Sequence, residues 1–125
     1  SPGTRGGRRV SLPPLDPHAI YKVLPRALWE ACQPSGWLQG SADDLRDGYI
    51  HFSTAEQLAG TLARHYAQVP DLLLIAVDPA KLGPALRYEV SRGGAQFPHL
   101  YAPLPVAQGR VVARRPVAAG DWHVD

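Results

Sequence analysis

The chain has 125 residues, which suits one domain with one core and is too short for two independent domains. Hydrophobic residues make up 45% and charged residues 19%, a balance that excludes a fibrous or wholly disordered protein. The net charge of +2 comes from residues 1–17, since residues 18–125 are formally neutral. We expect no nucleic-acid partner, because phosphate binding needs clustered cations, and we interpret Arg110, Arg114 and Arg115 as a solvated strand face.

The cysteine content and the apolar runs indicate the cellular setting. Cys32 is the only cysteine, so no internal disulfide can form and we expect a cytoplasmic protein. No apolar run approaches the ~20 residues of a membrane-spanning helix, and the N-terminus has no apolar signal core. We therefore expect no membrane contact.

Composition divides the chain into three parts. Residues 1–17 hold four prolines and three glycines without apolar periodicity, which predicts a flexible arm, either native or a cloning remnant. We expect packed structure from His18 onward, in a single α+β domain over residues 18–117. Residues 118–125 are predicted as a C-terminal tail, with Trp122 packed against the surface of the domain.

The first elements follow from apolar spacing and turn residues. Ala19 to Val23 is predicted as a strand, and a helix is expected to begin at Pro25 and to end before Pro34. Residues 37–47 are predicted as a loop, because their glycine and three aspartates favour turns. Tyr49 to Phe52 is predicted as a second short strand.

The second strand is expected to run directly into a helix. Ser53 to Glu56 has the spacing of a capping box, in which the first hydroxyl caps the helix. Apolar side chains at helical spacing extend this helix to near Gln68. The continuous apolar run from Leu72 to Val77 predicts the central strand, covered on both faces.

The C-terminal half is predicted as short strands joined by turns. One helical turn over residues 78–83 precedes a strand from Ala85 to Val90. Residues 91–98 are predicted as a loop, His99 to Tyr101 as a short edge segment, and Gly109 to Ala113 as the last strand. Two helices and about five strands in mixed order favour an α+β fold.

One segment with side chains suited to chemistry lies at the start of the second helix. Here a strand delivers His51, Ser53 and Thr54 to a helix N-terminus, where free amides favour anions or electron-rich oxygens. Alternatively, Ser53 only caps the helix and His51 is a hydrogen-bonded core histidine.

A second segment, Phe97 to Leu104, is clamped by prolines and presents His99 and Tyr101 on one side if it is extended. Alternatively, it is a packed loop whose aromatic side chains fill the core. The histidines and the single cysteine show no spacing typical of metal ligands, so we expect no metal.

Four motifs resemble those of the domain of unknown function 952 family, over about residues 20–112. They are Ile20-Tyr21-Lys22-Val23, Gly-Tyr-Ile-His-Phe-Ser-Thr at residues 48–54, Asp71-Leu72-Leu73-Leu74 and Phe97-Pro98-His99-Leu100-Tyr101. Their joint occurrence in this order is highly specific. The family's fold resembles that of the ADP-ribosyltransferases and of an RNA 2′-phosphotransferase. This resemblance implies two small sheets around a cleft, two main helices, and NAD as the natural ligand to test.

The resemblance also implies roles for single residues. Lys22 matches a first-strand position, His in many relatives, that contacts a ribose; a charged lysine can donate a hydrogen bond there but cannot accept a proton. His51, Ser53 and Thr54 match the element that frames the nicotinamide side of the cleft.

Stabilisation of the cationic sugar during cleavage of the glycosidic bond would require a carboxylate, and Glu89 is the candidate. Tyr21 or Tyr101 would be the stacking platform for the ligand.

Three functions follow as hypotheses. The first is an ADP-ribosyltransferase-like enzyme that binds NAD or a related nucleotide. The second is a small-molecule enzyme that uses His51 or His99 as general acid or base without NAD. The third is a non-catalytic ligand-binding module. The sequence makes no prediction of the oligomeric state.

Overall fold

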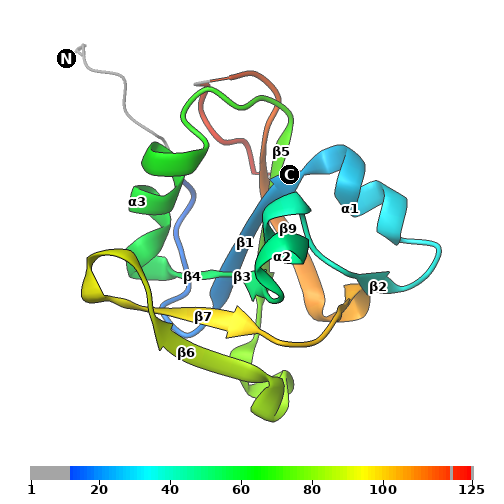
Figure 1. Ribbon diagram of the computed structural model, residues 1–125. Helices are drawn as coiled ribbons and strands as arrows, with labels where there is room; N and C mark the ends of the chain where they lie inside the picture. The colour runs from blue at the N-terminus through cyan, green and yellow to red at the C-terminus, as the bar shows by residue number, and fades with distance from the viewer. Residues whose placement is uncertain (1–11, 119, 125) are drawn as a thin grey trace.

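The fold is of the α+β class, as predicted. The structure is a computed structural model that describes residues 12–118 and 120–124. Over these residues the chain forms three small antiparallel sheets, three α-helices and four 3₁₀ turns (Figure 1). The helices are α1 (Arg26–Cys32), α2 (Ala42–Asp47) and α3 (Ala55–His65). The expected two main helices are thus joined by a third, and none in the described part is long and apolar enough to span a membrane.

The largest sheet has four strands in the order β4-β1-β5-β9. These are β1 (Ile20–Pro25), β4 (Ser53–Thr54), β5 (Leu72–Val77) and β9 (Gly109–Arg115). Every residue of β5 is buried, which confirms the predicted central strand. Strand β4 pairs only with Ile20 and Tyr21. The rest of that edge of β1 is therefore left uncovered by β4.

The two faces of this sheet pack against two separate hydrophobic clusters. Ile20 and Leu24 belong to the cluster on the side of α1 and the second sheet. Tyr21 and Val23 alternate with them and pack with side chains of α3 in the other cluster. Alternation places Lys22 on the face of Ile20 and Leu24. Its charged side chain is thus directed toward the remaining sheets.

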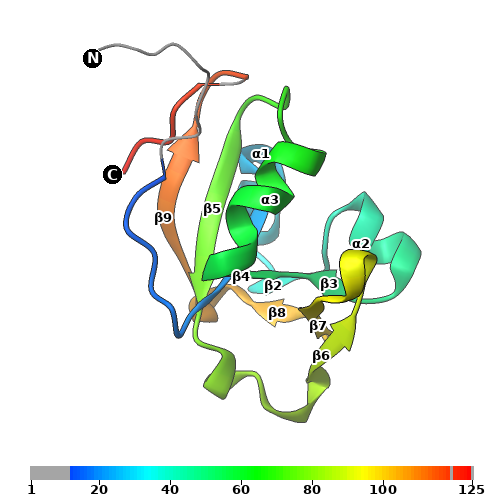
Figure 2. The same ribbon diagram turned by 90° about the vertical axis from the view of Figure 1, so that its left-hand side faces the viewer.

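The second sheet has three strands in the order β3-β7-β6, and a two-stranded sheet joins β2 to β8. The strands are β2 (Trp37–Leu38), β3 (Ile50–His51), β6 (Leu86–Val90), β7 (Gln96–Leu100) and β8 (Leu104–Pro105). Figure 2 shows the four-stranded sheet at one side of the molecule and β3, β6, β7 and α2 at the other.

The 3₁₀ turns are η2 (Pro79–Lys81), η3 (Gly83–Ala85), η4 (Arg92–Gly94) and η5 (Val106–Gln108). The first of them confirms the helical turn predicted within residues 78–83.

Strand β7 begins at Gln96 and is the middle strand of its sheet. The predicted loop over residues 91–98 is therefore wrong for residues 96–98, and the segment after it is not an edge. The misleading residue is Pro98, because proline lacks the N–H that a middle strand normally donates. Its carbonyl oxygen accepts from the Phe52 N–H at 3.0 Å. Strand β3 ends at His51. The pairing of β3 with β7 therefore requires no N–H from residue 98.

Residues 37–47 were predicted as a loop but contain β2 and α2. The Ser41 side chain accepts from the Asp44 N–H at 3.5 Å, and Asp44 Oδ2 accepts from the Ser41 N–H at 2.9 Å. Gly48 ends the helix with a φ of 88°. The turn-forming residues therefore act as helix caps, at both ends of one short helix.

Helix α3 begins one residue later than the predicted capping box implies. Thr54, not Ser53, is the N-cap: its hydroxyl accepts from the Gln57 N–H at 3.3 Å, and Gln57 Oε1 accepts from the Thr54 N–H at 3.0 Å. The Ser53 hydroxyl instead lies 2.8 Å from that of Thr61. The helix ends at His65, before the predicted limit near Gln68.

Packing extends beyond both predicted ends of the domain. Leu12 and Leu15 are partly buried against the cluster on the α3 side, and the Asp16 N–H donates to the Tyr21 hydroxyl at 2.7 Å. The packed chain thus begins before His18; residues 1–11 of the predicted arm lie outside the described residues.

At the other end, Trp122 is buried in the same cluster, which corrects its expected place on the surface. The guanidinium of Arg115 lies 5.2 Å from the Trp122 ring and donates to the carbonyl oxygens of Tyr66 and Val69. Only 1% of Arg115 is exposed. Arg115 therefore does not belong to a solvated strand face, whereas Arg110 and Arg114 are exposed.

Candidate functional site

A cleft of about 360 Å³ opens where the uncovered edge of β1 meets α2, α3 and the three-stranded sheet. The volume lies at the lower end of the roughly 300–1,000 Å³ typical of small-molecule sites. Side chains from all of these elements line it, and most of them are polar. The cleft therefore suits a small polar ligand.

The wall formed by β1 includes backbone groups. Val23 lines the cleft, although its side chain is buried in the core. The hydroxyl of Tyr66 donates to the Val23 carbonyl oxygen at 3.5 Å. Since the N–H and C=O of a strand residue point to the same side, the Val23 N–H also faces the cleft.

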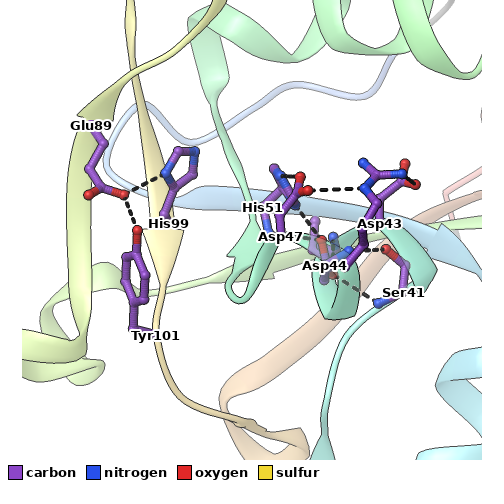
Figure 3. A network of polar contacts seen from close by, with 10 residues as sticks. Ser41, Asp43, Asp44, Asp47, His51, Glu89, His99 and Tyr101 are labelled. Atoms are coloured by element: carbon purple, nitrogen blue, oxygen red, sulfur yellow. Dashed lines mark hydrogen bonds and ion pairs between the residues drawn. The ribbon is translucent and has the colours of Figure 1, made fainter.

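A buried ion cluster joins β1, α2 and β3 beside this wall. The Lys22 ammonium lies 2.7 Å from Asp44 Oδ2, with side-chain exposures of only 3% and 1%. Asp44 Oδ1 accepts from the His51 N–H at 3.1 Å and from His51 Nδ1 at 2.6 Å (Figure 3). A single carboxylate thus ties three elements together at the cleft.

The charges in this cluster depend on one another. Burial opposes ionisation of Asp44, but the hydrogen bond from His51 and the charge of Lys22 outweigh it and hold the pKa of Asp44 well below its usual value. Burial also lowers the pKa of Lys22, against the opposing effect of Asp44. The Lys22 charge is therefore compensated by Asp44 and is not free to attract a ligand phosphate.

His51 is held at both ring nitrogens. Nδ1 faces Asp44, and Nε2 lies 3.0 Å from Asp47 Oδ2. Each ring nitrogen of His51 therefore already lies beside a carboxylate of α2, and neither is left without a protein partner for a ligand. His51 therefore connects β3 to α2, and this geometry does not support the predicted role as general acid or base.

His99 lines the same cleft but is engaged at only one nitrogen. Its Nδ1 lies 2.8 Å from Glu89 Oε1, and its side chain is 5% exposed. Nε2 has no hydrogen-bond partner among the described residues and points away from Glu89, toward the side of His51 (Figure 3). Because a carboxylate can only accept a hydrogen bond, we expect a neutral His99 ring to carry its proton on Nδ1 and to present a lone pair at Nε2.

Aromatic contacts fix the plane of the His99 ring. The Tyr49 ring stacks on it at a centroid distance of 4.0 Å and an interplanar angle of 25°. The His51 ring meets it edge-on at 5.6 Å. These contacts follow from the β3–β7 register, which places His51 directly opposite His99.

Glu89 lies behind His99 and is not among the residues that line the cleft. Its Oε1 accepts from the Tyr101 hydroxyl at 2.7 Å as well as from His99. These two donors, Tyr101 first, lower the pKa of Glu89. The carboxylate is therefore engaged in orienting His99, not directed at a bound sugar.

The two predicted stacking tyrosines differ in their positions. Tyr21 lines the cleft, but only 3% of it is exposed, because its ring packs in the core with its hydroxyl at Asp16. Tyr101 is exposed, but it does not line the cleft and the guanidinium of Arg87 lies 5.1 Å from its ring centroid. Of the two predicted hydroxyl residues, Ser53 lines the cleft, whereas Thr54 serves as a helix cap.

Charged residues that the sequence did not single out complete the cleft. Asp43 and Asp47 of α2 form ion pairs with Arg46. Arg64, in the last turn of α3, lines the cleft and makes no ion pair within the described residues. Over residues 12–118 and 120–124 no group of three or more His, Cys, Asp or Glu side chains could hold a metal ion. The unpaired cation therefore favours a ligand with an anionic group.

Residues 23–112 match the model of a family described as a protein of unknown function, DUF952. The chain belongs to the DUF952 family. This confirms the resemblance seen in the motifs, and the matched segment includes Asp44, His51, Glu89 and His99. No curated protein matches the chain.

Solved structures support the same relationship. The X-ray structure of CC0527 from Caulobacter crescentus is 48% identical, with a TM-score of 0.71, and the match covers 73% of this chain and 80% of that one. The solution NMR structure of CC0527 is 47% identical, with a TM-score of 0.67, and covers 74% and 80%. This DUF952 domain therefore shares its fold with CC0527.

Proposed function

We propose that this DUF952 domain is an enzyme that moves a proton to or from a small polar molecule held in the cleft, with His99 as the general base or acid. The observation that carries the proposal is the Glu89–His99 pair. His99 Nδ1 lies 2.8 Å from Glu89 Oε1, and since a carboxylate can only accept a hydrogen bond we expect the proton on Nδ1, while Nε2 has no partner among the described residues. A histidine oriented in this way can accept a proton from a ligand and return it.

The remaining parts of the cleft fit this role. When Nε2 takes up a proton, the positive charge of the ring is paired with Glu89 at 2.8 Å. Tyr49 stacks on the ring and keeps Nε2 aimed in one direction. Arg64 supplies a charge for an anionic group of the ligand, and the Val23 backbone supplies a hydrogen-bond donor and acceptor.

A second candidate is the ADP-ribosyltransferase-like function that the family resemblance implies, with NAD as ligand. The observation that favours it is the uncovered edge of β1, where the Val23 N–H and C=O could pair with a carboxamide such as that of nicotinamide. Two observations weigh against it, because Tyr21 is buried in the core and Glu89 is bonded to His99 and Tyr101.

An untargeted assay on a small-molecule extract of cells distinguishes these candidates. Wild-type protein, His99→Gln and the control His123→Gln are incubated with the extract, and the changes are followed by mass spectrometry. We expect a small polar compound to be consumed by the wild type and the control but not by His99→Gln, with all three folded by thermal unfolding. Consumption of NAD with release of nicotinamide would favour the second candidate. Retention of a compound without turnover would indicate a binding module and contradict both.

A further inference from the structure

Strand β6 is an edge strand whose outer side is unpaired in the part of the chain that the structure describes. It pairs with β7 through five residues and has no second neighbour in the sheet order β3-β7-β6. An open edge of this kind offers backbone N–H and C=O groups to another strand. Its alternating side chains indicate which strand fits there.

The hydrogen-bond pattern shows which backbone groups of β6 are free. The Tyr101 N–H donates to the Ala85 carbonyl oxygen at 2.8 Å, and the Ser91 N–H donates to that of Ala95 at 2.9 Å. Since bonding alternates along an antiparallel ladder, Arg87 and Glu89 also direct their backbone groups toward β7. The backbone groups of the residues between them, Leu86, Tyr88 and Val90, therefore lie on the outer side of β6. The Leu86 N–H already donates to the Gly83 carbonyl oxygen, so the Leu86 C=O and both backbone groups of Tyr88 and Val90 remain for a second strand.

We propose that two copies of this chain pair through β6, antiparallel and centred on Tyr88. In this register Tyr88 lies opposite Tyr88 of the second copy, and Leu86 lies opposite Val90. The two Tyr88 residues then exchange both backbone hydrogen bonds, and the Leu86 carbonyl oxygen of each copy accepts from the Val90 N–H of the other. The proposal concerns assembly and does not depend on the proposed function.

Charge complementarity selects this register. Centring the pair on Tyr88 places Arg87 of each copy opposite Glu89 of the other, and the two-fold symmetry makes this pair occur twice. Centring it on Arg87 or on Glu89 would instead place like charges opposite each other, which destabilises a ladder. The strand is therefore complementary to itself in one register.

The opposite face of β6 carries apolar surface that the pairing would cover. Tyr88 is 46% exposed and Val90 is 67% exposed. In the proposed register the two Tyr88 rings are cross-strand neighbours, and aromatic pairs of this kind stabilise sheets. The dimer would join two three-stranded sheets into one of six strands, with both clefts on the same face because the two-fold axis is perpendicular to the sheet.

Charge reversal with a rescue experiment tests the proposal. Arg87→Glu and Glu89→Arg, each alone, place like charges opposite each other in a homodimer, whereas an equimolar mixture of the two variants restores both pairs in a heterodimer. By sedimentation velocity over a concentration series, each variant alone should raise the dimer dissociation constant about tenfold or more. The mixture should return to the wild-type value. The control is Arg110→Glu, on the exposed side of β9, which should dimerise as the wild type does.

A wild-type protein that stays monomeric at every concentration would overturn the proposal. A dimer that Arg87→Glu does not weaken would also overturn it, because the copies would then meet through another surface.

Discussion

His51 and His99 lie opposite each other in the β3–β7 ladder, but their ring nitrogens have different surroundings. His51 faces a carboxylate at each nitrogen, Asp44 and Asp47. His99 faces one, Glu89, and leaves Nε2 to the cleft. Two histidines opposite each other in one ladder therefore differ: both ring nitrogens of His51 face a carboxylate, whereas His99 Nε2 has no partner among the described residues.

Removal of the Asp44 charge should destabilise the fold strongly. Asp44→Asn would leave the buried Lys22 ammonium without a compensating anion, and breaking a buried pair in this way costs about 3–5 kcal/mol. Urea unfolding measures the loss. The control is Asp43→Asn in the same helix, whose exposed side chain pairs only with Arg46 and should have little effect. Equal stability of the two variants would contradict a buried ion cluster.

The same carboxylate should make stability depend on pH. Because the pKa of Asp44 is lower in the folded state than in the unfolded chain, ionised Asp44 stabilises the fold at neutral pH. That contribution should be lost as the pH falls from about 4 toward the folded-state pKa. Unfolding free energies measured across this range should fall more steeply for the wild type than for Asp44→Asn. Parallel curves would contradict the depressed pKa.

The sequence predicted part of this site. Spacing and motif resemblance identified His51, His99 and Glu89, and the structure brings all three to one sheet. Asp44 was missed because the helix that carries it was predicted as a loop. The signal that could have revealed it is the Ser41-x-x-Asp44 spacing, which has the serine and acidic positions of a capping box.

Helix α2 shows how element ends position the site. The capping box of Ser41 and Asp44 begins the helix, and Gly48 ends it in the left-handed conformation. These six residues present Asp44 to Lys22 and Asp47 to His51. A short helix with little buried apolar surface is thus held by its caps and by the ion cluster.

The two glycines at Gly48 and Gly60 should respond oppositely to alanine. Gly48 has a φ of 88°, a conformation that costs an alanine roughly 1–2 kcal/mol. Gly60 lies inside α3 with open space around an added Cβ, so alanine should stabilise it by about 0.4–1 kcal/mol. Thermal unfolding of Gly48→Ala and Gly60→Ala compares the two. An unfolding midpoint that Gly48→Ala leaves unchanged would show that α2 does not need a left-handed residue at its end.

Strand β7 shows where sequence patterns fail at the scale of elements. Proline and paired glycines predicted a loop from residue 91, because proline normally excludes a middle strand. The structure accommodates Pro98 where β3 has already ended. Such a tertiary arrangement leaves no local signal, whereas the continuous apolar run of β5 was sufficient to predict its position correctly.

The whole molecule extends past the predicted domain limits because both ends of the described chain cover one face of the large sheet. Leu12, Leu15 and Trp122 all pack on the cluster that includes α3. Composition could not predict this, since residues 1–17 show no apolar periodicity. Isolated apolar side chains are buried here by tertiary contacts that leave no periodic pattern in the local sequence.

This packing makes the C-terminal segment part of the stable fold. Trp122→Ala should destabilise the protein by about 3–5 kcal/mol, because it empties a buried site and removes the ring beside the Arg115 guanidinium. Trp37→Ala, at a half-exposed tryptophan, should cost much less. Chemical denaturation of both variants provides the comparison. Similar losses would show that residues 120–124 do not pack as described.

We propose that the cleft between the sheets contains one histidine, His99, prepared for proton transfer. Long-range ¹H–¹⁵N NMR spectra of the His99 ring test it most directly, at a pH where the ring is neutral. We predict a proton on Nδ1 and a bare Nε2 in the wild type, with this preference lost in Glu89→Ala, because the Glu89 carboxylate is what holds the proton. A neutral His99 that carries its proton on Nε2 in the wild type would contradict the claim.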